Sequence, residues 1–151
     1  MRHVSVRILP LAPSDFDPWY PLWQGYLTFY ETRINDEVSR VTFARLTGGG
    51  EPMGGFIARD GGGEAVGITH WLLHRSCWSL GNYCYLQDLF VAPTARKGGV
   101  GRALIEAVYA KAQALGCPRV YWHTHETNHT AQRLYDQVAE LSGFIQYRKQ
   151  F

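Results

Sequence analysis

Residues 83–102, YCYLQDLFVAPTARKGGVGR, decide the fold of this chain. The first nine of them, Tyr83–Val91, are rich in aromatic and aliphatic side chains, a composition that predicts a central strand buried on both faces. Pro93 ends this strand, and the apolar residues of the next segment, Val100–Leu115, recur at helical spacing. The glycine-rich segment Arg96–Arg102 therefore lies where a strand is followed by an amphipathic helix.

This junction has the features of an anion site, because three glycines and three cations occupy seven residues. A helix N-terminus presents unpaired N–H groups and about half a positive charge. Glycines let such a backbone approach a bulky anion without Cβ clashes. The segment predicts a phosphate-bearing ligand, most naturally a pyrophosphate, although a plain glycine turn with solvated cations fits these seven residues equally well.

Two familiar phosphate motifs are excluded at this junction. A P-loop needs Lys and then Ser or Thr after its last glycine, whereas Arg102 and Ala103 follow here. The dinucleotide fingerprint needs a third glycine, which is missing after Gly99 and Gly101.

Downstream of the junction, the pattern predicts a strand, a helix and a final strand. The strand covers residues 119–125, RVYWHTH. Asn128 can cap the helix that follows. The apolar face of that helix comprises Ala131, Leu134, Tyr135, Val138 and Leu141. Gly143 ends the helix, and residues 144–151, FIQYRKQF, form the last strand.

Upstream, apolar runs predict strands at residues 2–9, 55–59 and 65–74, the last two joined by a glycine-rich hairpin turn. A short helix covers Val38–Leu46. The order of the elements predicts one α+β domain, residues 1–151, with helices on both sides of a single sheet.

An unusually aromatic helix lies between the first strand and the short helix. Its start, Ser14-Asp15-Phe16-Asp17, has the spacing of a capping box. Pro18 and Pro21 each remove a backbone donor, which predicts a kink or a restart of the helix.

Composition restricts the class of protein. The 46% hydrophobic and 19% charged residues are typical of a globular chain, and a net charge of +2 is too small to indicate nucleic acid. We expect no signal peptide and no bilayer-spanning segment. Cys77, Cys84 and Cys117 have no metal-ligand spacing, so reduced thiols in a cytoplasmic protein are expected.

The segment Arg96-x-x-Gly99-x-Gly101, preceded by the strand YLQDLFV and Pro93, resembles the acetyl-CoA motif of the GNAT superfamily of N-acetyltransferases. The strand VYWHTH, Asn128, Ala131, Leu134-Tyr135 and Gly143-Phe144 follow in the family's order. The amino-acid sequence from about residue 83 to 147 is especially similar to the branch of the family that contains fungal histone, polyamine and D-amino-acid acetyltransferases. The resemblance implies the GNAT-like fold, a central and mostly antiparallel mixed sheet flanked by helices.

The resemblance also implies the cofactor-binding residues for acetyl-CoA. They are Leu89, Phe90, Val91, Arg96, Lys97, Gly98, Gly99, Val100, Gly101, Arg102, Asn128, Ala131 and Tyr135. Backbone amides of Lys97 to Arg102 would hold the pyrophosphate. The main chain of Leu89 to Val91 would pair with the pantetheine arm as an added strand.

Two of these residues are implied to be catalytic. The Leu89 N–H would point at the thioester carbonyl as an oxyanion donor. Tyr135 is similar to the tyrosine that protonates the departing thiolate. Its place on the apolar stripe of its helix also fits a core tyrosine.

A group must also remove a proton from the substrate amine. Many family members have Glu where this chain has Gln87 or Tyr85, and strand alternation turns Asp88 to the opposite face unless a bulge re-aims it. The base is left open among Glu31, His123, His125, Glu126 and Asp88. Candidate substrate-binding residues are Tyr30, Glu31, Gln87, Asp88 and His123. Trp19, Trp23, Tyr26, Phe29 and Tyr30 form a cation-binding wall or simply core.

The resemblance therefore implies direct acetyl transfer from acetyl-CoA to a primary amine in a ternary complex, without a metal. The amine belongs to a small molecule, polyamine, amino acid or protein tail. We expect a homodimer and neither a nucleic acid nor a membrane as partner. The alternative is a non-catalytic CoA-binding module that senses acetyl-CoA or serves an assembly, which the missing strand carboxylate leaves open.

Overall fold

The computed structural model describes residues 5–151. Its strands are β1 (Arg7–Pro10), β2 (Met53–Arg59), β3 (Ala65–His74), β4 (Tyr83–Val91) and β5 (Val120–Tyr121). Its helices are α1 (Phe16–Phe29), α2 (Asp36–Thr47), α3 (Val100–Ala114) and α4 (His129–Val138), with two short 3₁₀ turns, η1 (Pro13–Asp15) and η2 (Pro93–Ala95).

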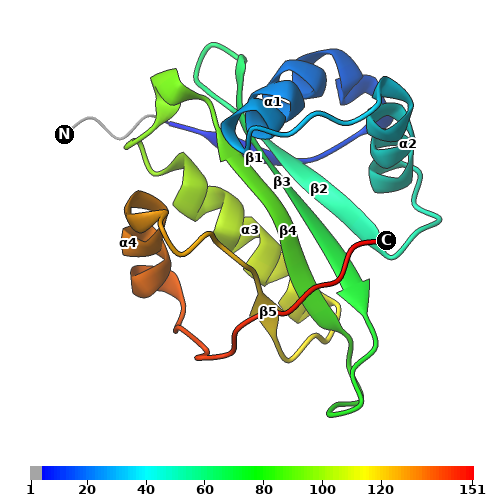
Figure 1. The fold of residues 1–151 in the computed structure, drawn as a ribbon. Coiled ribbons are helices and arrows are strands. Elements are labelled where there is room, and N and C mark those ends of the chain that lie inside the picture. Colours follow the sequence, from blue (N-terminus) through cyan, green and yellow to red (C-terminus); the bar gives the residue numbers. More distant parts are fainter. Residues whose placement is uncertain (1–4) are drawn as a thin grey trace.

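The strands form one sheet in the order β1-β2-β3-β4-β5. Every neighbouring pair is antiparallel except β4 and β5, which are parallel. Helices α1 and α2 pack on one face of the sheet, and α3 and α4 lie on the other (Figure 1). The predicted α+β fold, a mostly antiparallel mixed sheet between helices, is confirmed.

The α1–α2 face holds the aromatic part of the core. Trp19, Leu22, Trp23 and Leu27 of α1 are buried against Ile57 and Ile68 of the sheet. Much of the aromatic stripe is therefore core, which was one of the two predicted roles.

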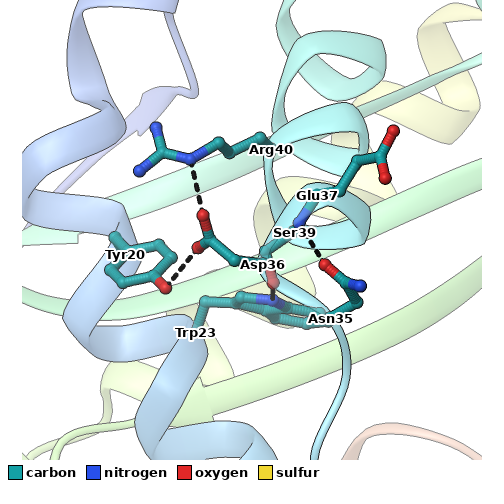
Figure 2. Close-up of polar contacts among 7 residues, drawn as sticks. All are labelled: Tyr20, Trp23, Asn35, Asp36, Glu37, Ser39 and Arg40. Carbon is teal, nitrogen blue, oxygen red and sulfur yellow. Dashed lines mark hydrogen bonds and ion pairs between the residues drawn. The ribbon is translucent and has the colours of Figure 1, made fainter.

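Side-chain hydrogen bonds join α1 to α2 (Figure 2). The Trp23 indole N–H donates to the Ser39 hydroxyl at 2.9 Å, and both side chains are buried. Asp36 accepts from the Tyr20 hydroxyl at 2.6 Å and from Arg40 Nε at 2.8 Å. The orientation of the aromatic helix is thus set by hydrogen bonds as well as by apolar burial.

The opposite face has a core built around α3. Val100, Leu104, Ile105, Val108 and Ala112 are all buried there. The predicted helix therefore forms with its apolar stripe toward the sheet, and it ends one residue earlier than expected, at Ala114.

The start of α1 differs from the prediction. Ser14 lies inside η1 and makes no capping bond; instead the Asp15 carboxylate accepts from the Ala12 N–H at 2.8 Å. The helix then runs without a restart through Pro18 and Pro21. Pro18 lies in the first turn, where N–H groups have no helical partner, so it removes no bond there.

Two predicted strands also differ. The first strand comprises Arg7–Pro10; residues 2–4 of the predicted strand lie outside the described residues. Strand 119–125 is reduced to Val120–Tyr121 because only these residues pair with β4. The final strand at 144–151 is wrong: this segment pairs with no described strand, and all its residues are exposed. An alternating pattern forms a strand only where a neighbour supplies the hydrogen bonds.

Candidate active site

Strands β4 and β5 separate after two residue pairs. Cys84 pairs with Val120 and Tyr85 pairs with Tyr121, and no further pair is found between the two strands in residues 5–151. On its other side β4 stays bonded to β3, and the Ala92 N–H donates to the Val66 carbonyl at 2.8 Å. Since backbone groups alternate along an antiparallel strand, those of Leu89 and Val91 point toward the open side.

The glycine-rich loop leads directly into α3 at one end of this opening. Lys97 and Gly99 have left-handed backbone conformations, with φ of 69° and 83°. The first helical bond joins the Ala103 N–H to the Gly99 carbonyl at 3.0 Å, so the amides of Val100, Gly101 and Arg102 have no helical partner. No acidic residue occupies the first turn of α3. The helix terminus therefore offers several donors and a positive dipole end to an anion.

The cations of this loop have different surroundings. Arg96 donates from Nε to the Val91 carbonyl at 3.1 Å, and its guanidinium lies 5.9 and 5.7 Å from the ring centres of Phe29 and Phe90. Arg102 bonds the side chain of Gln137, which joins α3 to α4. Arg96 thus supports the end of β4, while Lys97 is exposed.

Helix α4 brings Tyr135 to the α3 face of the sheet. Asn128 caps the helix, accepting from the Ala131 N–H at 3.4 Å, as predicted. The Tyr135 ring packs edge-on against Trp122, with centroids 5.4 Å apart. No hydrogen bond of its hydroxyl is found among residues 5–151. Burial first, and then the charge of Tyr30, raise the pKa of Tyr135 to about 12.

Tyr30 and Tyr135 come from opposite faces of the sheet. Tyr30 follows α1 on one face, and Tyr135 belongs to α4 on the other.

A β-bulge re-aims the middle of β4. His70 is opposite Asp88 and Trp71 is opposite Leu86, so Gln87 is the extra residue. Tyr85 and Asp88 consequently point to the same face, toward α1. Simple alternation would have turned Asp88 the other way, so the bulge that the sequence left open is present.

Asp88 is buried and hydrogen-bonded on that face. It is 8% exposed, and its Oδ2 lies 2.8 Å from His70 Nδ1. His70 in turn accepts at Nε2 from the Trp19 indole N–H at 3.0 Å. Sequence reasoning did not single out His70; its only indication was a histidine within the apolar strand AVGITHWLLH.

The structure brings some predicted substrate residues together and leaves others apart. The Tyr85 hydroxyl lies 3.1 Å from His123 Nδ1, and Asp88 and Tyr30 occupy the same side of the sheet. Gln87 is exposed at the bulge. Glu31 is exposed in the turn after α1, with φ of 52°.

Residues 5–151 contain no group of three His, Cys, Asp or Glu side chains arranged to hold a metal ion. None of their helices has the length and apolar character needed to cross a bilayer.

Solved structures share the architecture over nearly the whole chain. AAC(6')-Iy, an aminoglycoside N-acetyltransferase solved with the bisubstrate analogue CoA-S-monomethyl-acetylneamine, superimposes with a TM-score of 0.83. It is 20% identical, and the match covers 97% of this chain and 99% of that one. At this identity the likeness shows the fold.

Sequence comparisons assign the family. D-amino-acid N-acetyltransferase HPA3 of Saccharomyces cerevisiae is 40% identical over 150 residues, covering 99% of this chain and 93% of that protein. The uncharacterized N-acetyltransferase YhfO of Bacillus subtilis is 30% identical over 144 residues, with 94% and 95% covered. The model of the acetyltransferase (GNAT) family matches residues 15–139. The chain therefore belongs to the GNAT family of acyl-CoA-dependent N-acetyltransferases, as its motifs and its fold had indicated.

Proposed function

We propose that this chain, as a single domain, transfers acetyl from acetyl-CoA directly to the primary amine of a small molecule. Three features of the fold support this function. These are the unpaired amides of α3, the open edge of β4 at Leu89–Val91, and the Tyr135 hydroxyl. Together they supply an anion site, a strand edge and a proton donor.

The loop and the strand edge divide the binding of acetyl-CoA between them. The pyrophosphate is held by the backbone amides of Lys97, Gly98, Gly99, Val100, Gly101 and Arg102. The side chain of Arg96 holds the loop against β4. The main chain of Leu89, Phe90 and Val91 pairs with the pantetheine arm, beside Asn128 and Ala131 at the start of α4.

Chemistry follows at the same edge. The Leu89 N–H stabilises negative charge on the thioester oxygen, a contribution of about 3–4 kcal/mol for a donor of this kind. Tyr135 gives its proton to the departing thiolate. Because burial raises its pKa to about 12, the phenol stays protonated at neutral pH and is available as the acid.

A covalent cysteine intermediate is not part of this proposal. Burial, and then the charge of Cys117, raise the pKa of the Cys84 thiol to about 12. Burial also raises the pKa of Cys117. Thiolates are the nucleophilic form of cysteine, so neither side chain is activated for attack. The amine therefore attacks the bound thioester in a ternary complex.

We propose an amino acid, in the first place a D-amino acid, as the class of amine. Support comes from the relative that is 40% identical over nearly the full chain and is named a D-amino-acid N-acetyltransferase. Thiol release from acetyl-CoA tests this with D- and L-amino acids, spermidine, an aminoglycoside and a histone-tail peptide. Turnover greatest with the D-amino acids, with intersecting rather than parallel double-reciprocal plots, is expected. Tight acetyl-CoA binding without turnover on any amine would instead indicate the non-catalytic module.

We also propose that the protein is a cytoplasmic homodimer. Three free thiols suit a reducing compartment. Large apolar side chains at the end of the chain are more than three-quarters exposed and are available to a second copy: Leu141, Phe144, Ile145, Tyr147 and Phe151. Light scattering at several concentrations, with and without acetyl-CoA, tests the dimer; a monomer throughout contradicts it.

A further inference from the structure

A buried hydrogen-bonded chain, Trp19–His70–Asp88, joins α1, β3 and β4 behind the opening. Trp19 and His70 are 0% and 1% exposed. An indole nitrogen only donates, so the bond from Trp19 makes His70 Nε2 an acceptor. The ring proton of His70 is therefore on Nδ1, where it is donated to Asp88 Oδ2. The chain fixes both the tautomer of His70 and the orientation of the carboxylate.

This arrangement leaves the carboxylate with unused acceptor positions. Oδ2 is bonded to His70, and the Tyr26 hydroxyl lies close enough to donate to the same carboxylate. The Asp88 side chain keeps an exposed fraction of 10%. An ionised carboxylate accepts up to about four hydrogen bonds, and burying it with fewer is unfavourable. With bonds from His70 and Tyr26, the carboxylate can still accept from a donor outside the chain.

Three tyrosines lie near enough to this carboxylate for its charge to affect them. Burial first, and then the charge of Asp88, raise the pKa of Tyr26 and Tyr30, and a hydrogen bond with Asp88 adds to the effect at Tyr26. Burial, Tyr121 and Asp88, in that order, raise the pKa of Tyr85. The Tyr26 and Tyr30 rings are 4.9 Å apart, and Tyr30 is 44% exposed. Aromatic faces around a single carboxylate are suited to a cationic amine.

We propose that Asp88 binds the ammonium group of the substrate and takes its proton, and that Trp19 and His70 are positioning residues that orient its carboxylate toward the amine. This assignment rests on the proposed function. The substrate class it implies is a compact primary amine that carries a positive charge in solution. Asp88 would then serve as the general base, a role that the side chains of Tyr85 and Gln87 cannot fill because neither is a carboxylate.

The proposed step balances. An N–H bond of the ammonium group breaks, and the proton passes to the Asp88 carboxylate. The freed lone pair forms the C–N bond to the thioester carbon. When the C–S bond breaks, its electron pair stays on sulfur, which takes the Tyr135 proton. The nitrogen still carries two hydrogens at this stage, and it passes one of them as a proton, through water, to the Tyr135 phenolate. Asp88 then releases the first proton to water, so the products are the neutral amide, the free thiol and one proton in solvent.

Asp88→Asn tests this role, because the amide keeps the shape and can still accept from His70. The matched control is Asp36→Asn, a carboxylate at the start of α2 that accepts hydrogen bonds from Tyr20 and Arg40. Two amines are compared at pH 7: an alkylamine with a pKa near 10.4, and an amino-acid amide whose α-amine has a pKa near 8. We expect Asp88→Asn to lower kcat/KM for the alkylamine by about 10²-fold, and much less for the amide, which is already partly neutral.

Acetyl-CoA affinity and melting temperature are measured on the same preparations. Both should stay close to the parent values in Asp88→Asn, and Asp36→Asn should retain turnover on both amines. An equal loss on the two amines, or no loss, overturns the proton-transfer role. If the parent protein acetylates no amine, the proposed function fails first and this assignment falls with it.

Trp19→Phe tests the positioning role, because it removes the indole donor and releases His70 Nε2. The control is Ser39→Ala, which deprives the neighbouring buried indole of Trp23 of its partner. We expect both variants to lose stability, and only Trp19→Phe to lose more turnover on the alkylamine than on the amide. Equal behaviour of the two variants on the two amines overturns the positioning role.

Discussion

The glycine-rich loop and the Asp88 chain lie at the same opening of the sheet but are built in opposite ways. In the proposed site the loop draws its donors from backbone amides of six consecutive residues, Lys97–Arg102. The Asp88 chain depends on side chains from three elements, with Trp19 and His70 separated by 51 residues and His70 and Asp88 by 18. A site made of local backbone can be recognised from a motif, whereas one made of distant side chains exists only in the folded protein.

The largest effect is expected when a negatively charged side chain is placed in the glycine-rich loop, where the proposed site is made of backbone amides. Gly99 has a φ of 83° with open space around its Cβ position, and Gly63 in the β2–β3 turn has a φ of 84° with equally open space. Glutamate at either position costs about 1–2 kcal/mol of strain. Only Gly99→Glu places a negative charge at the phosphate position. We expect its acetyl-CoA affinity to fall by at least about 10²-fold.

Titration calorimetry measures this affinity, with Gly63→Glu as the control for strain. Gly63→Glu should lose similar stability and bind acetyl-CoA normally. Gly101→Glu should behave like Gly99→Glu, since a Cβ there would make only ordinary contacts at 3.4 and 3.8 Å with Leu134 and Val91. Unchanged affinity in both loop variants would refute the pyrophosphate assignment.

A second comparison contrasts two tyrosines on the α3 face. The Tyr109 hydroxyl donates to the Val138 carbonyl at 2.8 Å, whereas the Tyr135 hydroxyl has no partner among the described residues. Tyr135→Phe should lower kcat by about 10²-fold, the usual scale for losing a general acid, with little change in affinity or melting temperature. Tyr109→Phe should show the reverse, a loss of about 1 kcal/mol of stability with normal turnover. Near-normal turnover in Tyr135→Phe would end its assignment as the acid.

The smallest expected effect concerns the one loop cation that contacts β4. Arg96→Ala removes the bond to the Val91 carbonyl but leaves the amides of α3 in place. Acetyl-CoA should therefore bind less than about tenfold more weakly, since an exposed cation contributes modestly. A loss as large as that of Gly99→Glu would mean that side-chain charge, and not the backbone, dominates this site.

Local patterns predicted most of the elements around the opening. Strands β3 and β4 occur at the predicted residues, because their continuous apolar runs are bounded by turn-forming residues. The glycine-rich start and the apolar stripe of α3 likewise carried enough information to place that helix.

The remaining features depend on tertiary contacts. No glycine or proline marks the bulge at Gln87, so the face of Asp88 was undetermined until β3 and β4 were paired. The prediction of a final strand at residues 144–151 was wrong for a related reason. The alternation of apolar and polar residues can be read from the sequence, but the presence of a neighbouring strand cannot. His70 was missed because a lone histidine in an apolar strand gains meaning only from Trp19 and Asp88.

The short pairing of β5 has a consequence for cooperativity. Only two residue pairs join β5 to β4, and α4 contains no buried residue, so this unit should open at a lower free energy than the α1 side. Its amides should therefore exchange with deuterium sooner. A ligand that bridges the opening and is present at 100 times its Kd would add about 2.7 kcal/mol to the opening cost. The same looseness leaves a route by which the product can depart.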